Sequence, residues 1–224
     1  MKLGIVGAGG LGREVYIVAK KINAVEHCWD EMLFMDTDRT ITEVLGIRCL
    51  DVDEAMQTID DLEVVVAIGE PRIREKVYND IHNGGKELAT LIHPGVYIDE
   101  TTTIGKGCII CEGVTITSCV EIGDNTFIHP HAVIGHDIKI GKHCMIGANS
   151  EIGGANVIGD RSYFGFMSGT KELLTIGQDV ICSAGAIVFR DLPDGVIAVG
   201  NPARIMKNND DKTVFRHAKN KAEE

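Results

Sequence analysis

Two short motifs in this chain carry residue types that could do chemistry. His136 is followed directly by Asp137, and a carboxylate beside an imidazole can orient the ring and raise its basicity, so this pair predicts a general base. The segment Gly7–Gly12 matches the pattern GxGxxG. Its glycines would let the backbone approach a phosphate, and a following helix N-terminus would favour an anion. The motifs indicate proton transfer in one part of the chain and nucleotide binding in another.

The His136 pair lies inside a repeat of six residues. Isoleucine recurs at every sixth position, glycine often follows it, and the frame continues with other inward residues. The anchors are Ile92, Ile98, Ile104, Ile110, Ile116, Ile122, Ile128, Ile134, Ile140, Ile146, Ile152, Ile158, Phe164, Thr170, Ile176, Cys182 and Val188. Neither a helix nor a simple strand has this period, whereas a β-helix does. We therefore predict three-sided coils of about eighteen residues, with isoleucines pointing inward and glycines adopting the awkward backbone angles of the corners.

This repeat predicts where the candidate base points. If the anchor residue is counted as the first place of each hexad, His136 stands at the third place, so we expect it to project outward at a corner. Residues eighteen apart occupy the same place on successive coils, roughly 4.8 Å apart if the spacing is that of paired strands. Gly154 is one coil beyond His136. A glycine there would leave its backbone N–H open to a ligand oxygen, as an oxyanion donor requires.

The first 90 residues have a different pattern. Buried strands are expected at 2–7, 32–35, 62–68 and 88–91, and helices at 13–22, 52–59 and 71–81. This alternation predicts a small parallel sheet with helices on its faces. Asp36 follows the second strand, where a ribose-binding acid would lie. Because the unit has the size of one mononucleotide-binding half, we expect one nucleotide moiety rather than NAD. The alternative is a tight turn without a ligand.

Composition excludes several function classes. Lys and Arg number 22 against 33 Asp and Glu, giving a net charge of −11, which argues against nucleic acid or an anionic membrane as partner. No run approaches the roughly 18 apolar residues of a membrane span, and the N-terminus does not read as a signal peptide. The seven cysteines are an odd number, several of them at inward repeat positions, which favours a reduced, cytoplasmic protein without a disulfide framework or a metal site. Residues 208–224 are highly charged and predict a helical or frayed tail.

Several segments in order resemble one bacterial family, the sialic-acid O-acetyltransferases and nucleotide-linked amino-sugar N-acetyltransferases. The segments are Gly7–Gly12, 67–69 with 73–74, 91–94, 134–137 and 200–203. The resemblance implies a Rossmann-like domain over 1–90 that holds the nucleotide of an activated sugar, and a left-handed β-helix over 91–207. It also implies acetyl-CoA as the donor and a homotrimer with active sites between subunits.

The resemblance also implies the nucleotide contacts. The matching positions that would lie along the nucleotide are Gly9, Gly10 and Leu11. Asp36 and Thr37 would meet its base or ribose. Gly69 would line the same crevice. Some relatives have two acids where this chain has Asp36-Thr37, so the base is left open here.

For the donor, the resemblance implies contacts made mostly by the main chain. The amide of Gly154 would contact the acetyl carbonyl, and the main chain at Phe166 and Ala184 would bind the pantetheine arm. Met145 stands nine residues after His136, where some amino-sugar enzymes have a second histidine that contacts the donor. That contact would be absent or replaced in this chain.

These observations predict an acetyl-CoA-dependent N-acetyltransferase acting on a UDP- or dTDP-linked amino sugar, a 4-amino sugar, in bacterial surface-glycan biosynthesis. An O-acetyltransferase of sialic acid is an alternative, because nothing in the sequence decides between amine and hydroxyl acceptors. A non-catalytic nucleotide-binding scaffold is a third, and the His136 pair above Gly154 speaks against it. His129, His131 and His143 also lie in the repeat. Their spacing could suggest a metal site, but we expect buried or interface hydrogen bonding.

Overall fold

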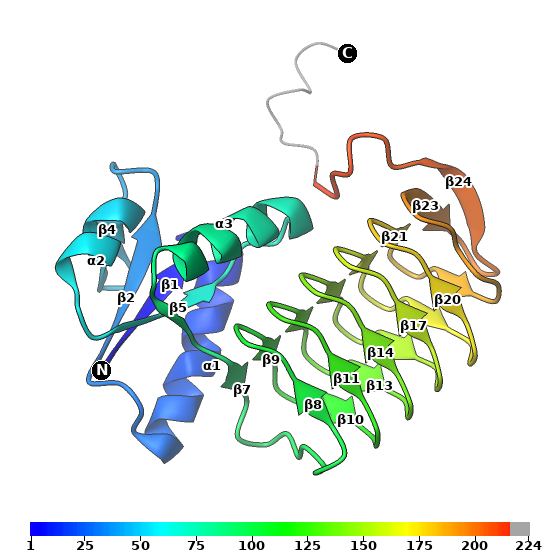
Figure 1. Cartoon of the computed structure of the whole chain (residues 1–224), viewed down its shortest axis with the longest axis horizontal. Coiled ribbons are helices and arrows are strands. Elements are labelled where there is room, and N and C mark those ends of the chain that lie inside the picture. Colours follow the sequence, from blue (N-terminus) through cyan, green and yellow to red (C-terminus); the bar gives the residue numbers. More distant parts are fainter. Residues whose placement is uncertain (216–224) are drawn as a thin grey trace.

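The computed structural model describes residues 1–215 and consists of a sheet with helices followed by a three-sided β-helix (Figure 1). The elements of the first part are β1 (Lys2–Val6), α1 (Gly10–Glu26), β2 (Glu31–Asp36), β3 (Glu43–Val44), β4 (Ile47–Asp51), α2 (Val52–Thr58), β5 (Leu62–Val66), α3 (Pro71–Asn83) and β6 (Glu87–Leu88). The sheet order is β3-β4-β2-β1-β5-β6. All neighbours are parallel except the β3–β4 pair. This is the Rossmann-like fold predicted from the sequence.

The helices cover opposite faces of this sheet because the strands alternate with a period of two. Leu3 and Ile5 of β1 pack with α1, whereas Val6 packs in the cluster that includes α2 and α3. Helix α2 begins after Asp51, whose carboxylate accepts hydrogen bonds from the backbone N–H groups of Asp53 and Glu54. This N-cap satisfies donors that the first turn of a helix leaves free.

Some of the helix and strand boundaries predicted from the sequence are wrong in this region. Helix α1 begins at Gly10, inside the glycine loop, and continues to Glu26. The strands β3 and β4 were not predicted, because they are short and only partly buried, so their hydrophobic pattern is weak. The single strand expected at 88–91 is two strands in different sheets. Residues 87–88 pair with β5, and 91–92 begin the β-helix.

The second part is built from two-residue strands, closed by a longer pair. They are β7 (Leu91–Ile92), β8 (Thr103–Ile104), β9 (Ile109–Ile110), β10 (Thr115–Ile116), β11 (Glu121–Ile122), β12 (Phe127–Ile128), β13 (Val133–Ile134), β14 (Lys139–Ile140), β15 (Met145–Ile146), β16 (Glu151–Ile152), β17 (Val157–Ile158), β18 (Tyr163–Phe164), β19 (Gly169–Thr170), β20 (Thr175–Ile176), β21 (Ile181–Cys182), β22 (Ile187–Val188), β23 (Val196–Val199) and β24 (Arg204–Asn208). They form three sheets, parallel except for the final β23–β24 pair.

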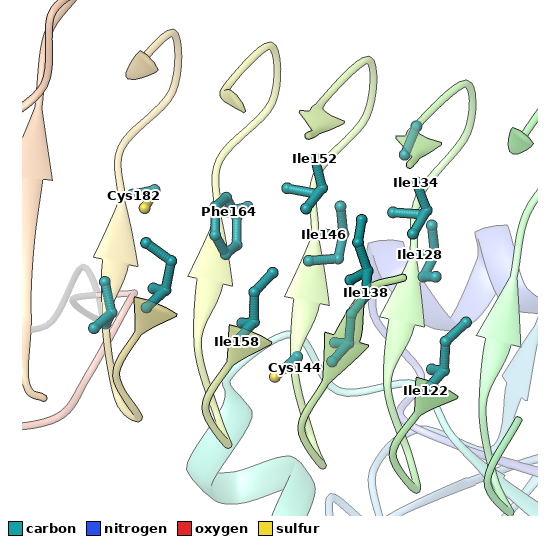
Figure 2. Close-up of a cluster of buried hydrophobic side chains, with 14 of the residues drawn as sticks. Ile122, Ile128, Ile134, Ile138, Cys144, Ile146, Ile152, Ile158, Phe164 and Cys182 are labelled. Atoms are coloured by element: carbon teal, nitrogen blue, oxygen red, sulfur yellow. The ribbon is translucent and has the colours of Figure 1, made fainter. Parts of the chain in front are cut away.

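The pairing has the predicted eighteen-residue step. Ile128 pairs with Ile146, and Ile134 pairs with Ile152. The anchor side chains stack in the interior of the prism (Figure 2). This arrangement is the left-handed parallel β-helix of hexapeptide repeats.

The reason given for the glycines was wrong. Left-handed backbone angles occur at the fourth place of the hexad, and residues such as Asn125 and Asp137 adopt them at φ 55 and 57°. Gly107, Gly113 and Gly185 also stand at the fourth place with such angles, but the glycines that follow the anchors stand at the second place without that geometry. There, a Cβ on Gly123 would lie 2.6 Å from the carbonyl carbon of Gly141 on the next coil. Close contact between coils, rather than backbone angle, therefore requires glycine.

One corner of the β-helix is covered by α3. We call the fourth-place residues that form this corner the covered corner, namely Gly107, Asn125, His143, Arg161 and Asp179. The buried guanidinium of Arg74 on α3 donates from Nε to the Asn125 carbonyl at 2.7 Å and from Nη1 to the Val66 carbonyl. Arg161 pairs with Glu75 of α3 at 3.1 Å and with Asp179 at 2.8 Å. Polar contacts thus hold the two parts of the chain together.

The adjoining face of the β-helix is covered by α1. Leu91, Ile109, Phe127 and Met145 belong to one buried cluster that also contains residues of α1 such as Val15. Helix α1 is therefore packed between the sheet and the β-helix. Within residues 1–215, no helix has both the length and the apolar character that crossing a membrane would need.

The end of the chain differs from the expected tail. Asn208 is the last residue of β24, which pairs with β23. Residues 209–215 then return toward α3, where the backbone N–H groups of Val214 and Phe215 donate to Glu70. The rest of the expected tail, 216–224, lies outside the described residues.

Candidate active site

His136 projects from the corner between β13 and β14. We call this corner, formed at the third and fourth hexad places by Ser118, Cys119, His136, Asp137, Gly154 and Ala155, the open corner. The His136 side chain is 63% exposed, and its Nδ1 lies 2.7 Å from Asp137 Oδ2. When Nδ1 carries the proton and donates it to this carboxylate, Nε2 holds a lone pair. Asp137 itself has a left-handed backbone angle, with φ 57°.

Gly154 lies directly beside the free nitrogen of this imidazole. A Cβ placed on Gly154 would stand 2.7 Å from His136 Nε2, so no larger residue fits without moving the ring. Within residues 1–215, the backbone N–H of Gly154 has no protein acceptor. A base and an open N–H donor therefore meet at one point on the surface, as the eighteen-residue step predicts.

Phe166 and Ala184 lie on a different corner. Each stands at the third place of its hexad, Phe166 after β18 and Ala184 after β21. They are one coil apart, and both are exposed. Their strands belong to the sheet that contains β15, whereas His136 follows β13 of another sheet. We call this corner the Phe166 corner. A single chain therefore does not bring Phe166 and Ala184 next to His136.

Met145 is not available to a donor. Its side chain is 2% exposed and packs in the cluster beneath α1. Its strand neighbours on the adjacent coils are Phe127 and Tyr163, so this position belongs to an apolar contact between the two parts of the chain. The structure therefore does not bring Met145 to the open corner.

The glycine loop is open where a ligand would need access. Helix α1 begins at Gly10 with Gly9 as N-cap and without a side-chain cap. A Cβ on Gly9 would meet nothing within 4 Å, whereas one on Gly12 would overlap the carbonyl oxygen of Gly7. Gly9 thus leaves space for a ligand, and Gly12 permits the close turn. The uncapped N–H groups of Gly10, Leu11 and Gly12 make this helix start suited to an anion.

Asp36 braces this loop. Its Oδ2 accepts a hydrogen bond from the Ala8 backbone N–H at 2.8 Å, and its Oδ1 accepts one from Asp38 at 3.0 Å. Asp36 and Thr37 also line a cavity of about 620 Å³ between the strand ends, α2 and α3. The residues lining the cavity include Gly7, Asp51, Asp53 and Ile68 but none of Gly9, Gly10, Leu11 or Gly69. The cavity therefore lies on the side of the sheet that α2 and α3 cover and does not reach the N-terminus of α1.

Gly69 lies on the other side of β1, after β5, and has a neighbour that sequence reasoning missed. The ring of Phe215 would be 3.4 Å from a Cβ on Gly69, and Leu11 would be 3.8 Å from it. Glu70 holds the backbone of this C-terminal segment. The one available signal was that Phe215 is the only Phe, Tyr or Trp among residues 208–224.

Two of the other repeat histidines, His129 and His143, have structural surroundings, whereas His131 is exposed. His143 Nδ1 lies 3.0 Å from Asn125 Nδ2, and its ring meets Tyr78 edge-on at 5.3 Å. The ring of His129 packs on Phe127 at 4.2 Å, and burial lowers the pKa of His129 to about 4. Across residues 1–215, no three His, Cys, Asp or Glu side chains are grouped as metal ligands would be.

Comparison with known proteins agrees with both parts of the structure. A family of N-terminal domains, described as the PglD N-terminal domain, matches residues 2–81, and the bacterial transferase hexapeptide family matches residues 119–154. A GDP-perosamine N-acetyltransferase of Escherichia coli O157:H7 is 30% identical over 219 residues, covering 92% of this chain and 96% of the relative.

Solved structures also match this chain over nearly its whole length. PerB of Caulobacter crescentus, in complex with CoA and GDP-perosamine, has a TM-score of 0.84 and 31% identity, covering 92% of this chain and 98% of that one. The acetyltransferase domain of PglB from Neisseria gonorrhoeae, in complex with acetyl coenzyme A, has a TM-score of 0.86 and 27% identity, with coverage of 92% and 98%. The N-terminal domain of sheet and helices, which we call the front domain, the β-helix and these relatives all agree. The chain therefore belongs to the family of acetyl-CoA-dependent, hexapeptide-repeat sugar N-acetyltransferases.

Proposed function

We propose that this protein transfers the acetyl group of acetyl-CoA to the amino group of a nucleotide-linked amino sugar, with His136 as the general base. The observation that carries the proposal is the imidazole at the open corner. Its Nδ1 is held by Asp137 at 2.7 Å, and its Nε2 faces the bare backbone of Gly154. Relatives that match over nearly the whole chain act on or bind GDP-perosamine, which supports this class of acceptor.

The chemistry follows from this geometry. The neutral amine of the sugar attacks the thioester carbonyl carbon while its proton passes to His136 Nε2. The carbonyl oxygen gains negative charge, which the Gly154 N–H stabilises by a hydrogen bond. The tetrahedral intermediate then collapses, the C–S bond breaks, and the CoA thiolate leaves and takes up a proton. The products are an amide and CoA. Asp137 keeps the ring in the tautomer that leaves Nε2 able to accept the proton.

The active site in this proposal is shared between subunits of a homotrimer. His136 and Gly154 lie on one corner, whereas Phe166 and Ala184 lie on another, so only a neighbouring chain can bring the two together. The exposed apolar side chains of Phe166, Met167 and Leu173, which are 59%, 62% and 78% exposed, support burial against another copy. A closed ring of identical chains would repeat this contact three times.

The front domain, in this proposal, holds the nucleotide. The diphosphate would lie at the α1 N-terminus over Gly9, Gly10 and Leu11, and the base would lie beside Asp36 and Thr37. UDP and dTDP remain predictions for the nucleotide, as does a 4-amino group on the sugar. GDP joins them because of the GDP-perosamine relatives. A cytoplasmic location and a role in bacterial surface-glycan synthesis also remain predictions.

A substrate panel tests the proposal. Purified protein is mixed with acetyl-CoA and with UDP-, dTDP- or GDP-linked amino sugars, or with sialic acid, and release of the CoA thiol is followed. We expect release with at least one nucleotide-linked amino sugar and an acetamide in the product by mass spectrometry. Acetylation of sialic acid alone would assign the O-acetyltransferase function instead. Nucleotide binding without any acetyl transfer would assign the scaffold function.

A further inference from the structure

The segment 209–215, which we call the C-terminal strap, connects the last coil of the β-helix to the start of α3 (Figure 1). At one end, Asn209 is 6% exposed and donates from Nδ2 to the Asp179 carbonyl at 3.0 Å. At the other end, the backbone N–H groups of Val214 and Phe215 donate to Glu70 Oε2 at 2.9 and 3.0 Å. The strap is therefore fixed at both ends and crosses between the two parts of the chain.

The strap delivers one aromatic ring to a defined place. The Phe215 ring meets the ring of Tyr163 edge-on at 5.5 Å, and it lies beside Gly69 together with Leu11. Leu11, Tyr163 and Phe215 thus form an apolar wall next to a glycine. Phe215 nevertheless remains 45% exposed, so much of its ring is free to contact a ligand.

A carboxylate oxygen at this wall lacks a partner. Glu70 is 9% exposed, its Oε2 holds the strap, and its Oε1 has no hydrogen-bond donor among residues 1–215. A buried carboxylate oxygen without a donor is costly. A ligand that brings a hydroxyl or an amino group to Oε1 would remove that cost.

The sheet order says which part of a nucleotide sugar reaches this wall. Strand β1 lies between β2 and β5. In a fold of this kind the phosphates lie over the loop after β1, and the base extends toward the end of β2. The group on the other end of the diphosphate then lies over the end of β5, where Gly69 and Glu70 follow. In a nucleotide sugar, that group is the sugar.

We infer that Phe215 is a substrate-positioning residue that forms a wall of the sugar subsite, carried there by the C-terminal strap and Glu70. This inference rests on the proposed function. The wall suits a sugar with a deoxygenated carbon, because a hydroxyl pressed against a phenyl ring loses its hydrogen bond to water. Glu70 Oε1 is the acceptor for a hydroxyl or amine of the same sugar.

The test compares Phe215→Ala with Phe215→Leu and a control, Tyr97→Ala, which removes an aromatic side chain that is 77% exposed elsewhere. Steady-state kinetics give KM for the nucleotide-linked amino sugar and for acetyl-CoA, and calorimetry gives Kd for the nucleoside diphosphate without sugar. Phe215→Ala should raise the nucleotide-sugar KM about tenfold, the loss of one good aromatic contact. It should leave the acetyl-CoA KM and the nucleoside diphosphate Kd unchanged. Phe215→Leu should recover part of the loss, and Tyr97→Ala should change nothing.

Three outcomes would overturn the inference, and they are distinguishable. An unchanged nucleotide-sugar KM in Phe215→Ala means that the ring does not touch the acceptor, while the proposed function stands. A nucleoside diphosphate Kd weakened as much as the nucleotide-sugar KM means that the ring contacts the nucleotide instead of the sugar. A wild-type protein that neither binds a nucleoside diphosphate nor acetylates a nucleotide sugar removes the proposed function, and the inference with it.

Discussion

The open corner and the covered corner of the β-helix occupy equivalent places in the hexapeptide repeat and do different things. At the covered corner, Asn125, His143 and Asp179 are between 0% and 5% exposed beneath α3. At the open corner, the side chain of Asp137, at the same hexad place, is 61% exposed. The repeat fixes where each residue points. The covering elements then decide whether a corner stabilises the fold or is free to bind a ligand.

The backbone donors show the same difference. At the third place beside α3, the N–H groups of Lys106 and Lys142 donate to the carboxylates of Asp124 and Asp160 on the next coil, at 3.1 and 2.8 Å. At the open corner, Gly154 has no such partner among residues 1–215. An uncapped N–H is unfavourable when it is buried, but at an exposed corner it is available to a substrate.

The largest effect should come from removing the imidazole of the open corner. His136→Ala should lower kcat about 10²–10⁴-fold, the usual loss of a positioned base, with little change in melting temperature because the side chain is exposed. Steady-state thiol release and circular dichroism measure the two effects. Lys139→Ala, on the same coil and 62% exposed, is the matched control and should be nearly silent. Near-normal turnover by His136→Ala would refute the role and make His131, which is also exposed, the next candidate.

Two glycine substitutions should separate chemistry from packing. Gly154→Ala places a methyl group 2.7 Å from His136 Nε2, so it should lower kcat about 10²-fold, as removal of an oxyanion contact does, with a small loss of stability. Gly123→Ala places a methyl group against the backbone of the next coil. It should destabilise the fold by about 1–3 kcal/mol while sparing kcat. Equal effects of both variants on kcat and on urea unfolding would contradict the distinction.

A pair of polar substitutions extends the comparison to the fourth place. Asn125→Ala removes hydrogen bonds to the Arg74 carbonyl and to His143, so it should cost about 1–3 kcal/mol of unfolding free energy with kcat preserved. Asp137→Asn, which keeps a residue type suited to a left-handed angle, should preserve stability. It should lower kcat by less than His136→Ala does, because Asp137 only orients the ring. Loss of kcat in Asn125→Ala at full stability would argue against this division.

The last effect concerns pH and leaves kcat aside. Burial lowers the pKa of His129 from 6.5 to about 4, so between these values the unfolded chain binds a proton that the folded chain does not. Stability should therefore fall as pH falls from about 6.5 toward 4. His129→Gln should flatten this decline in urea unfolding at pH 7 and pH 5, whereas His131→Gln, at an exposed position, should not. An unchanged slope in His129→Gln would show that His129 does not cause it.

The two regions were not equally predictable from the sequence. The β-helix and the His136–Gly154 contact could be predicted because both follow from one local period, so residues eighteen apart must meet. The covered corner could not be predicted because its partner, α3, belongs to the N-terminal sheet domain, and Arg74 lies 51 residues before Asn125. Arg74, Glu70 and Phe215 were missed for the same reason. Their partners are distant in sequence and no repeat relates them.

Two features of the repeat depend on neighbouring elements or coils. Met145 stands where some relatives have a donor-contacting histidine, and its position in the sequence does not reveal that α1 covers this face of the β-helix. The glycines were explained by backbone angles, but the left-handed place is two residues later in each hexad. In both cases, the position of a residue in the sequence does not show which neighbouring element or coil it meets.

The most direct test of a site shared between subunits is complementation. His136→Ala disables the open corner, and Ala184→Trp places an indole on the Phe166 corner where the pantetheine arm would run. Each variant alone should be nearly inactive. When both are co-expressed and form mixed trimers, about a quarter of the sites would combine an intact open corner with an intact Phe166 corner from the next chain, if mixing is random. The account predicts recovery of about that fraction of wild-type activity, whereas no recovery in trimers shown to contain both chains would contradict it.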